Sequence, residues 1–383
     1  MKVAIFIDQF TPGACPKFSG AEVKYLREKG YEAEIVAIME GGLPEESYQF
    51  QAYLDGVPIR YLSRERRLLK IFNFKLPMFA FFSMYHLISP VLIPKVIKRK
   101  EYDVIIAHTP LACFAAHQLW KRRGIPYINF MWDPMSFMLP RVYGERLPKR
   151  LVKLLTKVAL FFDRILANNS LVTLTCSQPH VNFIRSYINK DVEEIYPGCF
   201  PVEQIPEKRG DYVLALDRWD IGNLPHMFLD VWERLSKKVE LRVAGFWWPE
   251  ELRQSFIKLR DEKGLTDLVK ILGPVTEEEL SQLYLNARAF VHPINETFHT
   301  PVLEAAGYGC PTVMPNGFQI FNHGIHGFFA AEGHLDEFAE YVDRLVADER
   351  LAWKMGYESW KVAREHTWEQ HARKVEQVVT KYV

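Results

Sequence analysis

Short apolar runs that alternate with helical stretches recur along the chain, and no other feature limits its possible folds as strongly. Five such runs precede residue 180, namely Met1–Ile7, Glu34–Ile38, Asp103–Ala107, Pro126–Met131 and Leu171–Cys176. Each has the length of a β-strand, and turn or helical patterns separate it from the next. Repeated alternation of strand and helix predicts an α/β protein built on a doubly wound parallel sheet.

The alternation breaks near residue 200 and then restarts. Residues 196–210 are rich in Pro and Gly, and Tyr212–Leu216 and Glu240–Gly245 then begin a second series of apolar runs. A chain of 383 residues is too long for one ordinary core and suits two domains of about 150 to 200 residues each. We therefore predict two domains, 1–200 and 201–367, whose sheets face a shared cleft with the carboxyl ends of their strands.

The composition is that of an ordinary globular protein. A hydrophobic content of 48% with 25% charged residues argues against extensive disorder. The five cysteines are scattered and form no Cys-x-x-Cys pair, so neither a disulfide scaffold nor a zinc ribbon is expected. Because the sequence after Met1 lacks the pattern of a signal peptide, we expect a cytoplasmic protein with reduced thiols.

The net charge of +1 conceals a difference between the two halves of the chain. Residues 1–200 contain 27 Lys and Arg against 18 Asp and Glu, whereas residues 201–383 contain 21 against 29. A basic half beside an acidic half is consistent with an anionic partner for the first domain, although solvated surface charge is the commoner cause.

Two stretches concentrate this basic charge. Arg60–Lys100 has basic clusters on both sides of the apolar run Leu76–Ile93, and Arg146–Arg164 has Lys and Arg among apolar residues at amphipathic helical spacing. Both suit peripheral contact with an anionic membrane at its inner face, and a core helix with a solvated basic edge is the alternative. Two prolines, a serine and a histidine interrupt the apolar run, so it does not predict a membrane span. No nucleic-acid recognition motif accompanies the charge.

The segment from Glu296 to Glu304 contains the strongest candidates for a ligand site. Ala289–Pro293 is predicted to be a short buried strand, Thr300 a helix N-cap and Pro301 the first helical residue. One carboxylate would then follow the strand, and the other would lie in the first helical turn. A helix that begins at the carboxyl end of a parallel strand suits a diphosphate, and carboxylates beside it suit vicinal hydroxyls. The pattern is consistent with a sugar nucleotide, or alternatively with a helix-start charge at Glu304 and a solvated loop residue at Glu296.

Several other ligand-binding patterns are absent from the sequence. There is no Asp-x-Asp metal clamp and no Gly-x4-Gly-Lys-Ser/Thr phosphate loop, and Gly307-Tyr308-Gly309 lacks the third glycine of a dinucleotide fingerprint. ATPase and dehydrogenase functions are therefore disfavoured. We expect no metal and no cofactor other than a nucleoside-diphosphate sugar as donor substrate.

The surroundings of the two glutamates are similar to a known family. Lys270–Val275 precedes them, and Gly307–Val313 and Asn322–Phe328 follow. This run resembles the carboxyl-terminal domain of retaining glycosyltransferases with the GT-B fold, family 4 or the glycogen-synthase-like group, whose hallmark is two glutamates with seven residues between them. The resemblance is specific from Lys270 to Phe328 and weaker toward both ends. It implies two facing Rossmann-like domains, donor binding in the second, acceptor binding in the first, and a last helix at about 368–383 that packs back on the first domain.

The resemblance also implies roles for single residues in the second domain. Glu304 would hold the ribose and Glu296 the donor sugar, while Arg218 and the backbone amides of Phe298–Thr300 would hold the diphosphate. Ile221 stands where the family has a second cation, which would weaken stabilisation of the leaving group. A plain surface arginine is the alternative for Arg218.

In the first domain the resemblance points to Gly20 and Asp133. Gly20 follows the loop Phe10–Ser19 and would admit the donor at a helix start, with a simple turn as the alternative. Trp132 occupies the place of a family histidine near the sugar, so Asp133 becomes the candidate for a catalytic polar role, or else a turn residue before Pro134. His108 ends a strand that leads to the same cleft, although such a histidine is more often structural.

One further departure lies beside the expected anion. Thr297 and His299 replace small residues of the family pattern, and His299 adds a titratable ring there. The function that the resemblance implies is metal-independent, retaining transfer of a hexosyl group from a nucleoside-diphosphate sugar to a glycan, lipid-linked or other acceptor, without a protein nucleophile. The alternatives are a sugar-nucleotide epimerase of the same fold and a non-catalytic partner subunit.

Overall fold

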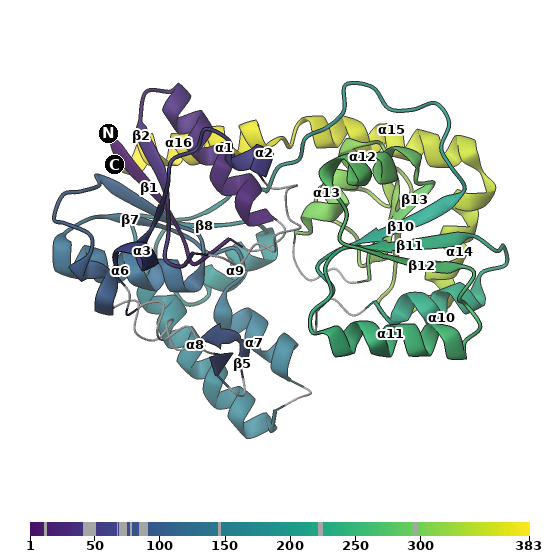
Figure 1. Ribbon diagram of the computed structural model, residues 1–383, viewed down its shortest axis with the longest axis horizontal. Coiled ribbons are helices and arrows are strands. Elements are labelled where there is room, and N and C mark those ends of the chain that lie inside the picture. Colours follow the sequence, from purple (N-terminus) through teal and green to yellow (C-terminus); the bar gives the residue numbers. More distant parts are fainter. Residues whose placement is uncertain are drawn as a thin grey trace. The chain divides into compact units, whose positions relative to one another are not determined.

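The structure is a computed structural model that describes residues 1–10, 14–40, 51–66, 68, 75–76, 79–83, 91–144, 147–220, 225–293 and 298–383. It divides into two compact units (Figure 1). The first contains the described residues up to Tyr196 together with His371–Val383, and the second contains Pro197–Gln370. The division thus lies a few residues before the predicted boundary, and most of the last helix, α16 (Trp368–Tyr382), belongs to the first unit.

Seven parallel strands form the sheet of the first unit, in the order β3-β2-β1-β6-β7-β8-β9. Their bounds are β1 (Lys2–Ile7), β2 (Glu32–Ala37), β3 (Ile59–Tyr61), β6 (Val104–Ala107), β7 (Tyr127–Phe130), β8 (Thr173–Thr175) and β9 (Val192–Glu194). All five apolar runs of the first domain are therefore strands, as predicted. The strand order reverses between β1 and β6, which makes this the switch point of a doubly wound sheet.

Helices of the first unit follow the expected alternation. They are α1 (Ala14–Glu28), α2 (Gln51–Leu54), α3 (Leu62–Glu65), the 3-10 helix η2 (Ile93–Lys95), α6 (Pro110–Arg123), α7 (Met135–Tyr143), α8 (Lys149–Asn169) and α9 (Gln178–Arg185). α6 shows how local sequence sets the ends of a helix. Thr109 caps it by accepting from the Ala112 amide, Pro110 starts it, and Gly124 ends it at φ 72°, a conformation that glycine adopts without strain.

Six parallel strands form the sheet of the second unit, in the order β12-β11-β10-β13-β14-β15. Their bounds are β10 (Tyr212–Leu216), β11 (Glu240–Ala244), β12 (Val269–Gly273), β13 (Ala289–Val291), β14 (Thr312–Pro315) and β15 (Gly327–Ala330). The chain builds outward from β10 to β12 and then returns to place β13 on the other side of β10. The switch point of this sheet therefore lies between β10 and β13.

Helices cover both faces of the second sheet (Figure 1). They are α10 (Met227–Arg234), α11 (Glu250–Glu262), α12 (Glu277–Asn286), α13 (Thr300–Gly307), α14 (Leu335–Ala347) and α15 (Glu349–Arg364). A continuous apolar core joins the sheet to α10, α11 and α14, with Trp219, Phe228 and Phe256 among its fully buried side chains. Buried aromatic side chains of this size contribute strongly to stability.

The structure describes only part of the first basic stretch, whereas most of the second forms a helix. Residues 67, 69–74, 77–78 and 84–90 of Arg60–Lys100, which include half of its apolar run, lie outside the described residues. A short antiparallel pair, β4 (Lys75–Leu76) and β5 (Phe79–Ser83), is described. The second stretch forms α8, as its spacing predicts. Within the described part of the chain, every helix is too short or too polar to cross a bilayer.

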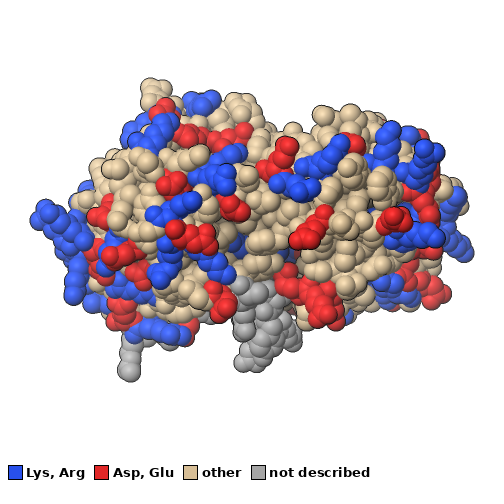
Figure 2. All heavy atoms as spheres, turned by 90° about the horizontal axis from the view of Figure 1, so that it is seen from above, with Lys and Arg blue, Asp and Glu red and all other residues tan. Residues whose placement is uncertain are grey.

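The excess of basic residues is not gathered into one patch on the face drawn in Figure 2. Blue Lys and Arg side chains and red Asp and Glu side chains are interspersed there. Several basic side chains of the first unit are paired locally, since Arg60 contacts Glu65 and Glu101, and Arg64 contacts Glu40. These ion pairs are consistent with solvated and locally paired surface charge at Arg60 and Arg64.

Candidate functional site

Polar side chains gather at the switch point of the second sheet. Asp217 and Arg218 directly follow β10, and His292 directly follows β13, the strand that pairs with β10. Doubly wound sheets bind their ligands at such a point, just beyond the carboxyl ends of the strands. The segment from Glu296 to Glu304, which the sequence analysis indicates, therefore follows a strand that ends at a position where such sheets bind ligands.

A hydrogen bond joins the two strand ends. His292 Nε2 lies 2.8 Å from Asp217 Oδ2, and the Arg218 amide donates to Asp217 Oδ1 at 2.6 Å. Burial raises the pKa of Asp217, but the hydrogen bond and charge of His292 outweigh burial and lower it overall. Asp217 is thus a carboxylate that accepts a hydrogen bond from His292 Nε2–H.

His299 lies against this pair as a neutral ring. Its centroid is 4.1 Å from that of His292. Burial, with the neighbouring His292 as a second cause, lowers the pKa of His299 from 6.5 to about 3. The ring that His299 adds here is therefore uncharged near neutral pH, because desolvation disfavours the imidazolium form. Its Nε2 is buried without a hydrogen-bond partner.

These three side chains are also the described group whose donor atoms lie close enough for a shared metal ion, within 4.8 Å of one another. Imidazole and carboxylate are ordinary ligands of zinc and related metals. However, Asp217 and His292 already satisfy each other at 2.8 Å. A cation would have to replace this hydrogen bond.

α13 begins within a few residues of this cluster. Its N-cap is His299 and its first residue is Thr300, so the prediction of Thr300 as the N-cap is wrong by one position. Pro301 has no N–H, and the amides of the first turn lack partners within a helix. Phe298 is buried 4.5 Å from the Phe318 ring and fixes the chain before the helix. The mouth of α13 therefore presents backbone donors and a partial positive charge.

Glu304 does not lie in the first turn of α13 as predicted, because that turn contains no acidic residue. The helix begins at Thr300, which places Glu304 one turn further along. Its Oε2 accepts from the Tyr284 hydroxyl of α12 at 3.4 Å, and the Tyr284 ring stacks on Tyr308 at 5.2 Å. Glu304 is thus oriented by an aromatic neighbour and remains half-buried.

Arg218 is held beside the strand end by an acidic neighbour. Its Nε donates to Asp220 Oδ2 at 3.0 Å, and 47% of the Arg218 side chain is exposed. Beneath it, Trp219 is fully buried and its indole N–H donates to the Ala244 carbonyl. The guanidinium therefore stands at the edge of the sheet but shares its charge with Asp220.

Three residues that the sequence argument used lie outside the described residues. Glu296 and Thr297 belong to the interval 294–297, and Ile221 belongs to 221–224. The predicted convergence of Glu296 and Glu304 stays a prediction.

In the first unit, Gly20 lies inside a helix and not at its start. α1 begins at Ala14, so the predicted loop up to Ser19 is wrong in its second half. Pro16 is compatible with the helix because it lies in the first turn. A β-carbon on Gly20 would collide with the Tyr53 carbonyl. The close approach that requires glycine is thus to the backbone of α2, and an approach of donor stays a prediction.

Trp132 and His108 belong to one buried network. The Trp132 indole donates to His108 Nδ1 at 3.2 Å, and His108 Nε2 lies 2.9 Å from Glu22 Oε2. Because Nδ1 accepts, the ring proton is on Nε2 and is donated to Glu22. The other oxygen of the Glu22 carboxylate, Oε1, lies 2.9 Å from His371 Nε2. On the far side of that ring, His371 Nδ1 lies 2.8 Å from the Tyr196 carbonyl. These buried contacts are consistent with the structural role considered for His108.

Asp133 lies next to this network and lines a pocket. Its carboxylate is 3.8 Å from His180 Nε2, and 42% of its side chain is exposed. Burial lowers the pKa of His180 to about 4, so His180 is neutral. At the switch point of the same sheet, Thr109 donates to Asp8 at 2.6 Å, and burial raises the pKa of Asp8 to about 6.

Two family descriptions match this chain, one in each unit. Glycosyltransferase Family 4 matches residues 21–199, and Glycosyl transferases group 1 matches residues 219–348. Both units also have the parallel doubly wound sheets of the GT-B fold. The chain belongs to the family 4 glycosyltransferases.

Solved structures support the same fold for this glycosyltransferase. HepE of Anabaena, in complex with UDP and glucose, has a TM-score of 0.75 at 15% identity and covers 100% of both chains. Sucrose-phosphate synthase of Thermosynechococcus elongatus has a TM-score of 0.74 at 15% identity and covers 99% of this chain and 98% of its own. At these identities the likeness shows the fold alone.

A curated relative is similar over part of the chain. D-inositol 3-phosphate glycosyltransferase of Frankia alni is 25% identical over an alignment of 276 residues, and the match covers 64% of this chain and 66% of the relative. The match therefore spans slightly less than two thirds of that relative's length.

Sequence reasoning missed two groups of the glycosyltransferase that the structure brings together. One is the pair Asp217 and His292. Asp217 directly follows the predicted strand Tyr212–Leu216, and His292 lies at the end of the predicted strand Ala289–Pro293, so these positions could have indicated the contact. The other is Glu22 with His371, whose positions differ by 349 residues. No local pattern links them, and only the return of α16 to the first unit makes the contact.

Proposed function

We propose that this glycosyltransferase moves a hexosyl group from a nucleoside-diphosphate sugar to a glycan, lipid-linked or other acceptor, with retention of the anomeric configuration and without a metal ion. One observation carries the proposal most directly. α13 begins a few residues beyond the end of β13, at the switch point of its sheet, and its first amides lack helical partners. This is the arrangement that binds a diphosphate.

The donor would lie along the edge formed by β10, β13 and α13. The amides of Phe298–Thr300 would receive the diphosphate, and Arg218 would supply positive charge as the bond to the sugar breaks. Glu304 is half-buried and acceptor-only when ionised, so it would take hydrogen bonds from the ribose hydroxyls. Glu296 would hold the donor sugar. The structure of HepE contains UDP and glucose, so UDP-glucose is the first donor to test.

The acceptor would bind in the first unit. Asp133 is half-exposed at a pocket there and would orient the acceptor hydroxyl. The departing phosphate would take the proton of that hydroxyl on the face where the new bond forms, so no protein nucleophile is needed. Gly20 would limit bulk on the donor side, although its nearest neighbour is the carbonyl of Tyr53.

Peripheral membrane contact is part of the same proposal, and α8 supplies the surface. Leu154, Val158 and Phe161 lie four and three residues apart on this helix and are 58%, 46% and 60% exposed. Lys153 and Lys157 are exposed beside them. An exposed apolar stripe with flanking lysines suits an anionic lipid surface, where a lipid-linked acceptor would be found.

A donor screen followed by a transfer assay tests the function. Thermal unfolding is measured with UDP, GDP, ADP and dTDP sugars, since a ligand at about 100 times its Kd adds about 2.7 kcal/mol of stability. The donor that stabilises the protein is then incubated with candidate acceptors in the presence of EDTA. We expect a product that keeps the anomeric configuration of the donor. An inverted product would contradict the retaining mechanism, and activity abolished by EDTA would contradict metal independence.

A non-catalytic partner subunit is the second candidate, and a specific contact favours it. Arg218 is already paired with Asp220, and Asp217 places another carboxylate next to it, which lowers the positive charge available to a diphosphate. The two candidates differ in donor binding. Stabilisation by a sugar nucleotide favours the enzyme, and no response to any of the four classes favours the partner subunit.

A further inference from the structure

Three side chains of the second unit converge without a part in the transfer proposed above. They are Asp217, His292 and His299, and their donor atoms lie within 4.8 Å of one another. The first two directly follow β10 and β13, and the third is the N-cap of α13. Among the residues that the structure describes, no other group of three His, Cys, Asp or Glu side chains brings its donor atoms together in this way.

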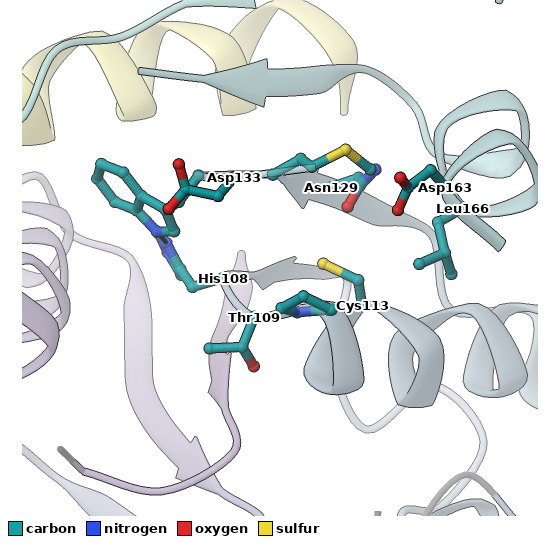
Figure 3. Close-up of a pocket in the computed structure, with 10 residues that line it drawn as sticks. His108, Thr109, Cys113, Asn129, Asp133, Asp163 and Leu166 are labelled. Carbon is teal, nitrogen blue, oxygen red and sulfur yellow. Dashed lines mark hydrogen bonds between the residues drawn. The ribbon is translucent and has the colours of Figure 1, made fainter. Parts of the chain in front are cut away.

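The histidine beside the pocket of the first unit provides a contrast (Figure 3). His108 lines that pocket together with Asp133, but both of its ring nitrogens are engaged, with Trp132 and with Glu22. In the second unit, His299 Nε2 is buried and has no hydrogen-bond partner. Buried polar atoms are rarely left in this state. The cluster of Asp217, His292 and His299 therefore contains a ring nitrogen that the fold itself does not use.

The hydrogen bond between Asp217 and His292 is the contact that an ion would have to replace. His292 Nε2 and Asp217 Oδ2 lie 2.8 Å apart, and both atoms are themselves possible ligand atoms. Ligation would thus exchange one hydrogen bond for three metal–ligand bonds, with the His292 proton moved to Nδ1. Donor atoms around tetrahedral zinc lie about 3.3 Å apart. The short pair would open slightly and the longer spacings, none above 4.8 Å, would close by side-chain rotation.

The cluster is accessible from one side. The Asp217 side chain is 13% exposed and that of His292 is 0% exposed, while His299 is partly exposed. His292 therefore forms the floor of the cluster, and an ion would enter beside Asp217 and His299. A bare zinc ion is smaller than a water molecule, so the low exposure of His299 Nε2 to water does not exclude ligation. Three protein ligands leave a fourth position, on the exposed side, for water.

The ligand atoms select the class of metal. Two imidazole nitrogens and one carboxylate oxygen suit zinc and similar transition metals. Magnesium and calcium prefer sites made of oxygen atoms alone. The five cysteines are buried and none belongs to the cluster, so thiolate ligands are not expected here.

We propose that Asp217, His292 and His299 form a binding site for a zinc-class transition-metal ion, with water as the fourth ligand. The ion joins the ends of β10 and β13 to the N-cap of α13 and so fixes the start of this helix. It takes no part in the transfer, because the Asp217–His292 hydrogen bond links the two strand ends when the ion is absent. The sequence-based expectation of no metal rested on the lack of an Asp-x-Asp clamp, a pattern that this site does not need.

Metal binding by the full chain tests the proposal directly. Protein treated with EDTA and then freed of it is titrated with ZnCl2 by calorimetry, and MgCl2 is the counter-probe. Asp217→Asn and His299→Gln each replace one ligand by a side chain that binds zinc weakly. His334→Gln is the matched control, because His334 is an exposed histidine at the start of α14 in the same unit.

We expect one zinc ion to bind the wild type and His334→Gln with equal affinity and to raise the thermal midpoint of both. Asp217→Asn and His299→Gln should bind zinc at least tenfold more weakly in whichever variant keeps the metal-free wild-type midpoint. The proposal is overturned if the wild type does not bind one zinc ion, if magnesium binds as tightly, or if a folded ligand variant binds like the wild type.

X-ray absorption by the zinc-loaded wild type tests the ligand set without any variant. We expect two imidazole ligands and only nitrogen or oxygen atoms at about 2.0–2.2 Å from the metal. Sulfur atoms in the first coordination sphere, or fewer than two imidazoles, would overturn the assignment even if both ligand variants failed to fold.

Discussion

Replacing Glu22 by Gln should destabilise the first unit, because it removes the charge of a buried carboxylate that two histidines contact. The side chains of Glu22, His108 and His371 are fully buried, and both histidines contact the carboxylate at 2.9 Å. Burial raises the pKa of Glu22, but the interactions with His108 and then with His371 outweigh burial and lower the pKa from 4.5 to about 2. At 1.36 kcal/mol per pKa unit, that difference corresponds to about 3 kcal/mol of folding free energy.

The sign of the pH dependence follows from the lowered pKa. A carboxyl group whose pKa is lower in the folded state stabilises the fold fully above pH 4.5, and this contribution is lost as the pH falls toward 2. The wild type should therefore exceed Glu22→Gln by about 3 kcal/mol at pH 7, and the difference should shrink below pH 4.5.

Urea unfolding followed by circular dichroism measures this difference for the transition of the first unit. Glu28→Gln is the matched control, because Glu28 is an exposed residue of the same helix. Surface substitutions usually change the free energy of unfolding by no more than about 0.5 kcal/mol. If the unfolding free energies of Glu22→Gln and Glu28→Gln agreed within that range, the reasoning would be refuted.

Three further predictions concern other parts of the chain. Gly245→Ala should lower the free energy of unfolding by about 2 kcal/mol or more, because Gly245 has φ +115° and an added β-carbon would collide with the Asp217 carbonyl. The control is Gly264→Ala, at φ +65° in open space, which should lower it by about 1 kcal/mol in the same urea titration. His299→Asn should reduce the stability lost between pH 7 and pH 5. The low pKa of His299, about 3 in place of 6.5, means that only the unfolded chain binds the proton there, which costs the wild type about 2 kcal/mol at pH 5; equal losses in both proteins would contradict this. Phe161→Ser should weaken co-sedimentation with phosphatidylserine vesicles without lowering the thermal midpoint, because this side chain is 60% exposed. Unchanged sedimentation would exclude α8 as the membrane contact, and neutral phosphatidylcholine vesicles are the control.

The strands could be predicted well because their signal is local. Tyr212–Leu216 is one example, where the predicted run and β10 coincide. A short run of apolar residues between turn signals needs little tertiary information to become a buried strand. The last helix, Trp368–Tyr382, lies within the range of about 368–383 that the family resemblance implies.

The ends of two site helices were harder to predict, because a cap depends on geometry as much as on residue type. The Gly and Pro content of Phe10–Ser19 suggested a loop with Gly20 at the helix start, yet a proline in the first turn and a glycine packed on a neighbouring backbone are both compatible with α1. Thr300 is a common N-cap residue, but His299 has the extended backbone that defines the cap of α13. The one-residue error at the cap of α13 explains why Glu304 was predicted in the first turn and lies in the second.

The polar network of the first unit could not be predicted from the sequence. Glu22 contacts His108 and His371 across separations of 86 and 349 residues. The cluster of Asp217, His292 and His299 in the second unit likewise forms only when β13 pairs with β10. Such contacts depend on tertiary packing, and neither propensity nor spacing encodes them locally.

The most direct test of the proposed donor site is sugar-nucleotide binding by the wild type, Glu304→Ala and Glu278→Ala. Glu278 is an exposed residue of α12 and serves as the control. We predict that one of the UDP, GDP, ADP or dTDP sugars binds the wild type and Glu278→Ala equally by calorimetry. It should bind Glu304→Ala at least tenfold more weakly, about 1.4 kcal/mol, through loss of the ribose contact. No binding of any of these donors to the wild type, or equal affinity in Glu304→Ala, would contradict the account.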